Sequence, residues 1–256
     1  MMLSEPVYTL RYSIPVAGQE ENLRACRVRS ATTETTMKST DSLPLPVAIL
    51  HAAMETFMER GYDQTSMDEV AARARTTKRT VYSHYGNKEA LFRAALGQAV
   101  ELFLGKLQAP SDLREPADEL EAFAARFCEL CTVRGSVRLQ RVAMGLAERF
   151  PDIGHMLHRD VIERAEAMMA GYLAALARDR DLVAGAEAEI WGAKAARLFL
   201  NLATGSQRFQ TLLGAREPLD GPPGPETSPQ VDREPIARAV ALFLAGIGVE
   251  GGQERG

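Results

Sequence analysis

The stretch "SMDEVAARARTTKRTVYSHYGNKEAL", residues 66–91, decides the fold of this chain. Ser66 and Glu69 have the spacing of a capping box, in which each side chain binds the other residue's backbone N–H at the start of a helix. The apolar pattern of that helix stops after about two turns, at a break around Arg75 and Thr76. The sequence therefore predicts a short helix followed by a tight turn.

Two further helix starts follow the turn. Thr77 can cap a short helix that runs through Tyr85. Asn87 can then cap a longer helix from Lys88 to about Lys106. The tight turn is thus expected to join two short helices, with a long helix after them.

The segment before residue 66 has helical periodicity as well. Leu50, Ala53, Met54 and Phe57 recur at the spacing of an amphipathic helix, and Gly61 can end that helix. One helix that supports two short helices joined by a tight turn is the arrangement of a helix-turn-helix.

Positive charge is concentrated in the helix 77–85 and its flanks. The whole chain has 30 Lys and Arg residues against 34 Asp and Glu, yet the stretch from Arg73 to Lys88 has five basic residues and no acidic one. Such a local basic strip in an acidic protein indicates a surface for a polyanion. A solvated helix face without a partner is the alternative, because many charge runs are only that.

The periodicity of this helix separates an inner from an outer face. Val81 and Tyr85 are four residues apart and can both face the interior, which leaves a second set outside: Lys78, Arg79, Tyr82 and Ser83. These side chains can reach phosphates and base edges, since the second helix of a helix-turn-helix fits the major groove of double-stranded DNA. The predicted function is therefore DNA binding.

With these parts in order, residues 47–96 resemble the DNA-binding domain of the TetR/AcrR family of transcriptional repressors. The resemblance is carried by "ILHAAMETFMERGYDQTSMDEVAARA" (49–74) and "TTKRTVYSHYGNKEAL" (76–91). The later "RFPDIGHMLHR" (149–159) and "ALFLAGIG" (241–248) are similar to C-terminal segments of the family, more loosely. The resemblance implies a homodimer, an operator with two half-sites, and a C-terminal helical domain that binds a small effector and forms the dimer.

The resemblance also implies roles for single side chains. Arg79 and Thr80 would contact bases. Phosphate contacts would come from Thr65, Thr77, Lys78, Tyr82, His84 and Lys88. One position departs from the family's pattern, because Arg75 stands where the family usually has a glycine in the turn. A left-handed conformation would cost arginine about 1 kcal/mol more than glycine. The turn is therefore expected either to adopt a variant geometry or to gain a phosphate contact from Arg75 that offsets the strain.

No alternating strand pattern appears anywhere, so the predicted fold class is all-α: an N-terminal helix-turn-helix DNA-binding domain followed by a helical ligand-binding and dimerisation domain. Further helical stripes cover residues 120–131, 137–150, 161–176, 191–202 and 236–247. The segment 216–235 is rich in Pro and Gly and is expected to be a mobile loop.

The expected domains are a disordered arm (1–44), the DNA-binding domain (45–96) and the helical domain (97–250). Translation that begins at Met37 is an alternative to a genuine arm. The dimer interface is predicted to be a four-helix bundle from residues 186–213 and 234–248 of both copies, because these are the two most apolar late helices.

A helical ligand domain must line its cavity with apolar side chains. The candidates are large apolar residues of the later helices: Met144, Phe150, Met168, Met169, Trp191 and Phe199. Taken singly, each fits a core position better than a pocket position, yet some of the set should face the effector. No charged residue stands out as a ligand anchor.

Cys128 and Cys131, with His155 and His158, could in principle hold zinc. Both cysteines extend the apolar stripe through Phe127, where free cysteine is a common core residue. Two cysteines three apart on one helix also differ from the turn geometry that zinc-binding CxxC pairs use. We therefore expect no metal site.

Several other classes lack their sequence signals. There is no GxSxG, no glycine-rich phosphate loop after a strand and no HExxH, so neither an enzyme nor a bound cofactor is expected. Three cysteines are too few for a disulfide framework and suit a cytoplasmic protein. No apolar run reaches the ~18–20 residues of a membrane span, so no membrane partner is expected.

The sequence thus predicts a transcriptional regulator, most simply a repressor that a small apolar effector releases from a palindromic operator. Two alternatives stay open. One is an activator or an effector-independent DNA binder. The other is a helical interaction protein whose helix-turn-helix is vestigial, with Arg75 as the symptom.

Overall fold

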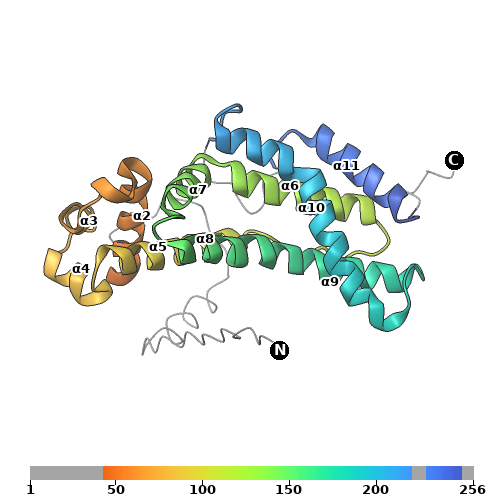
Figure 1. Cartoon of the computed structure of the whole chain (residues 1–256), viewed down its shortest axis with the longest axis horizontal. Helices are drawn as coiled ribbons and strands as arrows, with labels where there is room; N and C mark the ends of the chain where they lie inside the picture. Colours follow the sequence, from red (N-terminus) through yellow and green to blue (C-terminus); the bar gives the residue numbers. More distant parts are fainter. Residues whose placement is uncertain (1–42, 221–228, 250–256) are drawn as a thin grey trace, which may run out of the picture. The chain divides into compact units, whose positions relative to one another are not determined.

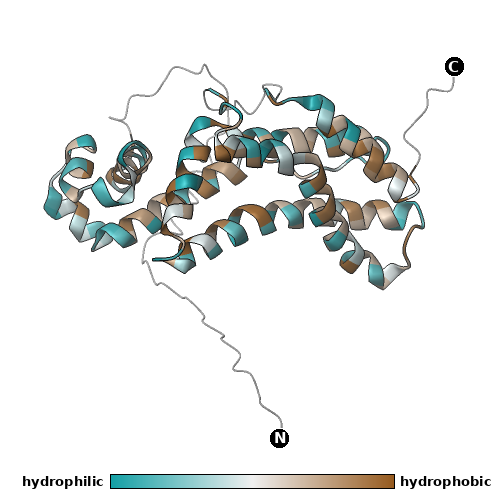
Figure 2. Ribbon diagram, turned by 45° about the horizontal axis from the view of Figure 1, so that its top comes forward, coloured by the Kyte–Doolittle hydropathy of each residue, from teal (hydrophilic) through white to brown (hydrophobic). Residues whose placement is uncertain are grey.

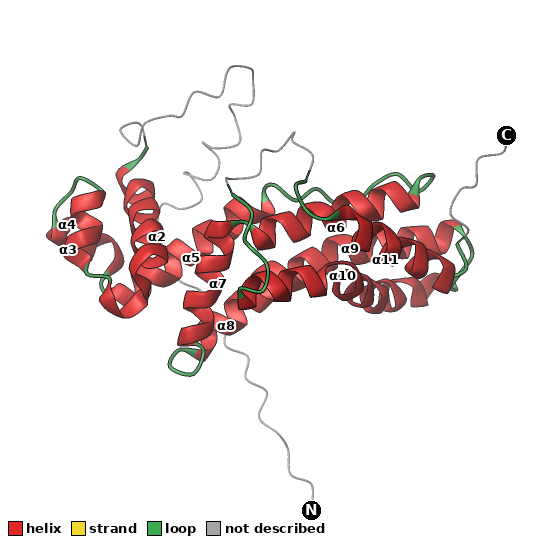
Figure 3. Ribbon diagram, turned by 90° about the horizontal axis from the view of Figure 1, so that it is seen from above, coloured by secondary structure: helices red, strands yellow, loops and turns green. Residues whose placement is uncertain are grey.

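The computed structural model describes residues 43–220 and 229–249. Nearly all of the predicted arm and the centre of the Pro/Gly-rich segment lie outside these ranges. Within them the chain consists of helices and loops (Figure 3). A single isolated bridge joins Val133 to Leu219, and the described residues form no β-strand. The all-α fold class is thereby confirmed.

Four consecutive helices hold the helix-turn-helix (Figure 1). They are α2 (Leu45–Gln64), α3 (Met67–Arg73), α4 (Lys78–Tyr85) and α5 (Lys88–Leu104). α2 is broken near its end, because Gly61 has φ 76° and ψ 174°, a conformation that glycine adopts without steric cost. The expected helix stop at Gly61 is therefore present as a break inside α2.

A first hydrophobic core holds these four helices together. Its fully buried side chains include Ile49, Phe57, Val70, Val81, Leu91, Phe92 and Leu96. The same core includes Leu139 and Leu146 of α7 (Arg134–Leu146) and Ile153 of α8 (Pro151–Leu157). Helices that follow residue 96 thus complete the core under the helix-turn-helix, which local periodicity did not foresee.

A second core lies among the longer helices, which are α6 (Pro116–Thr132), α9 (Arg164–Asp179), α10 (Ala188–Leu213) and α11 (Arg233–Gly246). The π-helix η2 (His158–Glu163) leads into α9, and the 3₁₀-helix η3 (Gly185–Glu187) leads into α10. Hydrophobic and hydrophilic residues alternate around these long helices (Figure 2), whereas α4 is mainly hydrophilic. The long helices are therefore amphipathic, as their sequence stripes predicted.

Candidate nucleic-acid interface and ligand cavity

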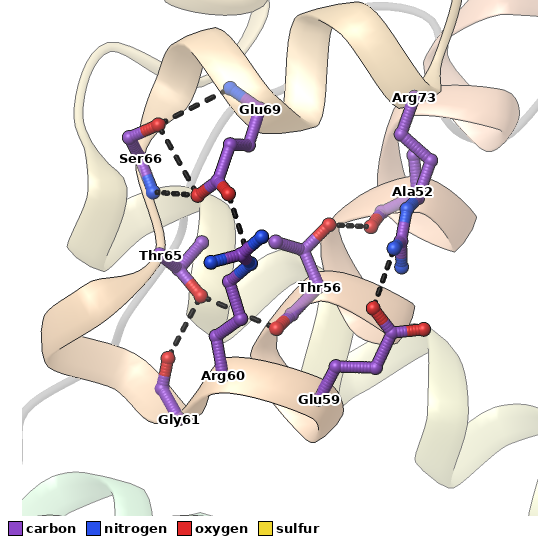
Figure 4. Close-up of polar contacts among 9 residues, drawn as sticks. All are labelled: Ala52, Thr56, Glu59, Arg60, Gly61, Thr65, Ser66, Glu69 and Arg73. Atoms are coloured by element: carbon purple, nitrogen blue, oxygen red, sulfur yellow. Dashed lines mark hydrogen bonds and ion pairs between the residues drawn. The ribbon is translucent and has the colours of Figure 1, made fainter.

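The capping box at the start of α3 forms as predicted (Figure 4). Ser66 Oγ accepts a hydrogen bond from Glu69 N at 3.2 Å, and Glu69 Oε2 accepts one from Ser66 N at 3.3 Å. Glu69 also pairs with Arg60 of α2, with 2.9 Å between Oε1 and Nε. The same carboxylate thus starts α3 and ties it to α2.

Arg73 lies at the end of α3 and turns toward α2 rather than toward solvent. Its Nη2 donates to Glu59 Oε2 at 2.5 Å (Figure 4). This hydrogen bond lowers the pKa of the Glu59 carboxyl and raises the pKa of Arg73. One of the five basic residues in the strip is therefore committed to a carboxylate of its own chain.

The turn between α3 and α4 has the geometry of a Schellman motif, in which one residue is left-handed. Arg75 is that residue, with φ 52°. Thr76 N donates to Ala71 O at 2.9 Å, and Arg75 N donates to Ala72 O at 3.2 Å. Arg75 thus adopts the left-handed conformation discussed above, and the variant turn geometry is not seen.

α4 is capped by Thr77, whose Oγ1 accepts a hydrogen bond from Thr80 N at 3.2 Å. The hydroxyls of these two residues also lie 2.9 Å apart. Val81 is fully buried, and the Tyr85 hydroxyl donates to Pro46 O at 2.9 Å. Burial raises the pKa of Tyr85 to about 12, so this phenol stays a hydrogen-bond donor. The inner face of α4 is the one expected from the sequence.

The outer face of α4 is exposed and holds the remaining predicted contacts: Lys78, Arg79, Tyr82, Ser83 and His84. Arg79 forms no hydrogen bond or ion pair with any described residue. Lys78 Nζ donates to Asp68 Oδ2 at 2.7 Å, which raises the pKa of Lys78. A phosphate at Lys78 would compete with this carboxylate, whereas Arg79 is ready to bind.

Thr65 and Lys88 hold the broken end of α2 instead of facing outward. The Thr65 hydroxyl is buried and donates to Gly61 O at 2.7 Å (Figure 4). Lys88 Nζ donates to the carbonyls of Tyr62, Asp63 and Thr65 at 3.0, 3.1 and 3.2 Å. An ammonium has three donors, so all of those on Lys88 are used. The phosphate contacts of both residues stay predictions, and each would require an existing hydrogen bond to break.

A cavity of about 770 Å³ opens beside both cores. Its apolar wall comes from α2, α5, α6, α7 and the α8–η2 segment, and it includes Met54, Met58, Phe103, Leu130, Leu139, Leu157, Val161 and Ile162. Of the six residues that were expected to line an effector pocket, only Met144 is part of this wall.

The other five lie elsewhere. Met169 and Phe199 are fully buried in the second core, and Met168 and Trp191 pack against its edge. Phe150 belongs to the first core, where its ring lies 5.6 Å from that of Tyr62. These five residues therefore do not line this cavity, and their contact with an effector stays a prediction. Periodicity identifies the apolar face of a helix, but not whether that face meets another helix or a cavity.

Sequence reasoning missed one polar residue of the cavity, Arg208 on α10. Its guanidinium carbon lies 4.8 Å from the centre of the Phe127 ring, and its Nε is buried without a hydrogen-bond partner. A buried polar group of this kind calls for an explanation. The local signal was slight, since one arginine on an amphipathic helix ordinarily faces solvent.

The cysteine pair is part of the core. Cys128 and Cys131 are 0% and 5% exposed, and burial raises the pKa of Cys128 to about 12. His158 is exposed and lies 3.2 Å from a carboxylate oxygen of Glu163. Among the described residues, no three His, Cys, Asp or Glu side chains cluster as metal ligands would. Nor does any helix in those ranges have the length and hydropathy needed to cross a bilayer.

Comparison with known proteins gives matches over both parts of the chain. The family profile for bacterial regulatory proteins of the tetR family matches residues 49–95. The profile for the C-terminal domain of AefR-like transcriptional repressors matches residues 118–246. The first match contains the whole helix-turn-helix, and the second spans half of the chain.

Individual relatives agree with these profiles. The transcriptional regulator RutR of Escherichia coli K12 is 28% identical over 142 residues, which is 54% of this chain and 59% of RutR. The transcriptional repressor BepR of Brucella suis is 34% identical over 80 residues, 31% of this chain and 32% of BepR. The chain thus aligns with less than two thirds of either relative.

Solved structures share the fold. The flavonoid-responsive regulator FrrA superposes with a TM-score of 0.62 at 24% identity, over 79% of this chain and 96% of FrrA. A TetR-family regulator from Mesorhizobium loti gives a TM-score of 0.59 at 21% identity, over 82% and 98% of the two chains. The helix-turn-helix, the helical domain behind it and both profile matches lead to one conclusion. The chain belongs to the TetR family of bacterial transcriptional regulators.

Proposed function

We propose that the protein is a homodimeric repressor that acts on cytoplasmic DNA and binds a palindromic or near-palindromic operator with α4 of each copy. The observation that carries this proposal is the outer face of α4, where Arg79 and Tyr82 project from a helix with no acidic residue. An α-helix fits the major groove, and two such helices read half-sites about 34–36 Å apart. Because its relatives are transcriptional regulators, we propose no catalytic activity for this protein.

The regular turn favours this proposal over a vestigial helix-turn-helix. The vestigial alternative took Arg75 as its symptom. With both Schellman hydrogen bonds present, α3 and α4 keep the relation that DNA binding needs.

A stripe of exposed apolar residues supports the proposed dimer. Large apolar side chains of α10 and α11 are 48 to 67% exposed: Ile190, Leu198, Leu202, Phe209, Leu213 and Leu242. Monomers rarely expose a contiguous apolar patch, and these residues fall within the two segments predicted to form the four-helix interface.

The cavity supports control by a small effector. Met54 and Met58 belong to α2 of the helix-turn-helix, whereas Leu130 and Arg208 belong to helices of the second core. A ligand there would contact both parts of the chain. If it binds one arrangement of α2 more tightly than another, it lowers operator affinity by linkage.

The first test is selection of binding sites from random duplex DNA, at about 150 mM salt to suppress non-specific binding. A motif with two-fold symmetry is expected, with the footprint of two half-sites. The Arg79→Ala variant should select a motif that has lost preference at one position in each half. Failure of the folded dimer to enrich any motif would contradict the proposal.

A further inference from the structure

We infer that the cavity beside α2 binds an amphipathic carboxylic acid, with an apolar body on the cavity wall and one carboxylate on the Arg208 guanidinium. The inference rests on the proposed function and deepens it, because it names the chemical class of the effector.

Arg208 is a cation without a counter-charge. Within the described ranges it pairs with no carboxylate. Its side chain hydrogen-bonds the Cys131 thiol and its guanidinium carbon lies 4.8 Å from the centre of the Phe127 ring, but its Nε is buried without a hydrogen-bond partner. A guanidinium cannot lose its proton to escape this cost. A buried donor normally has a hydrogen-bond partner, and a carboxylate is the partner that best fits a guanidinium.

The charge of the cavity wall has one sign. Its basic lining residues are Lys106, Arg134, His158 and Arg208, and no Asp or Glu is among the described residues that line it. The side chains of Arg134 and His158 are 42% and 61% exposed and already pair with Asp220 and Glu163. These two lie toward solvent, and Lys106 is half-buried. Among these four side chains of the described lining, only Arg208 has a buried nitrogen without a partner.

The rest of the cavity wall indicates that the ligand has a large apolar part. It is mainly apolar and includes three methionines (Met54, Met58 and Met144), whose flexible side chains adapt to varied shapes. A volume of about 770 Å³ suits a small molecule. One shielded guanidinium neutralises one charge, and its planar fork matches the two oxygens of a carboxylate. The geometry therefore favours a monoanion with a large apolar part.

Calorimetric titration of the full chain, without DNA, tests the inference. The probes are hexanoate, decanoate, tetradecanoate and 2-naphthoate, each compared with its matching alcohol. At least one acid should bind about tenfold or more tighter than its alcohol, as expected for a charge-assisted hydrogen bond. Arg208→Met should abolish this preference while alcohol binding persists, and Arg208→Lys should keep part of it.

Arg197→Met is the matched control, because Arg197 lies on the same helix with 69% of its side chain exposed. It should bind the acids as the wild type does. The unliganded Arg208→Met protein should unfold at the wild-type temperature or above, since a buried donor without a partner has been removed; a merely structural arginine would predict a lower temperature.

Equal affinity for acid and alcohol, binding of no acid in the series, or a preference that survives in Arg208→Met would each overturn the inference. Because the titration contains no DNA, its result tests acid binding separately from operator binding. Acids that bind through Arg208 but do not release the operator would leave this inference intact and contradict the proposed release step.

Discussion

At the scale of single residues, two lysines of the basic strip have different tasks. Lys78 is exposed and meets the side chain of Asp68, whereas Lys88 donates to three backbone carbonyls at the end of α2. A surface ion pair contributes little to stability. A hydrogen bond from a charged donor to a backbone carbonyl at a helix end contributes more to stability.

Lys88→Met should therefore lower the free energy of unfolding by about 2 kcal/mol. Lys78→Met should change it by less than about 0.5 kcal/mol. Urea denaturation of both variants measures the difference. Equal stabilities would show that Lys88 does not hold α2 and would restore it as a candidate phosphate contact.

Arg79 and Lys78 should differ in how they affect DNA binding. Arg79→Ala is expected to cost about 1–3 kcal/mol on the preferred site and to relax selectivity at one base pair. Lys78→Ala should weaken binding to all sequences alike and reduce the salt slope by about 1. Affinities for single-base operator variants across a salt series distinguish these outcomes. Loss of selectivity in both variants would contradict the assigned roles.

At the scale of elements, α4 is only eight residues long and depends on its cap. Thr77→Ala removes the acceptor for Thr80 N and should cost about 1 kcal/mol, with weaker operator binding because the start of the reading helix frays. Thr76→Ala is the control, because the Thr76 hydroxyl bonds no described residue. Unfolding curves and operator affinity of both variants test this. Equal losses of stability and affinity in the two variants would contradict a specific role for the Thr77 cap.

α9 and α10 approach so closely that glycine is required at their contact. A Cβ on Gly192 would lie 2.6 Å from the backbone oxygen of Ala170. Gly192→Ala should therefore destabilise the fold by about 1–3 kcal/mol, despite the better helix propensity of alanine. Gly171→Ala on α9 meets no atom within 4 Å and should be neutral or stabilising by up to ~1 kcal/mol. Thermal unfolding compares the two, and a stable Gly192→Ala protein would contradict the packing.

At the scale of the whole molecule, the exposed stripe on α10 and α11 predicts the assembly. Phe209, which is 59% exposed, should be covered in the dimer, so Phe209→Glu is expected to give a folded monomer that loses specific operator binding. Leu45→Glu, at a 40% exposed leucine of α2, should remain dimeric. Analytical ultracentrifugation at micromolar concentration measures this. A wild-type monomer, or a dimeric Phe209→Glu protein, would place the interface elsewhere.

The sequence by itself determined the helices and their order, and hence the fold class. The caps at Ser66, Thr77 and Asn87 formed where their spacing predicted. These signals are local: a cap is satisfied within three residues, and an apolar stripe within two turns of one helix. The inner position of Val81 followed from the same periodicity, and so did the exposed face of α4.

Only the tertiary structure decided which side chains line the cavity and which cations remain free to bind. Met54 and Arg208 line one cavity although their numbers in the sequence differ by 154 (208 − 54), and no local pattern predicts this proximity. Thr65 and Lys88 turn inward and donate to carbonyls at the broken end of α2, an end that only the folded chain brings near Lys88. Propensity and capping act between neighbours along the chain, whereas cavities and buried charges arise where separate helices pack together.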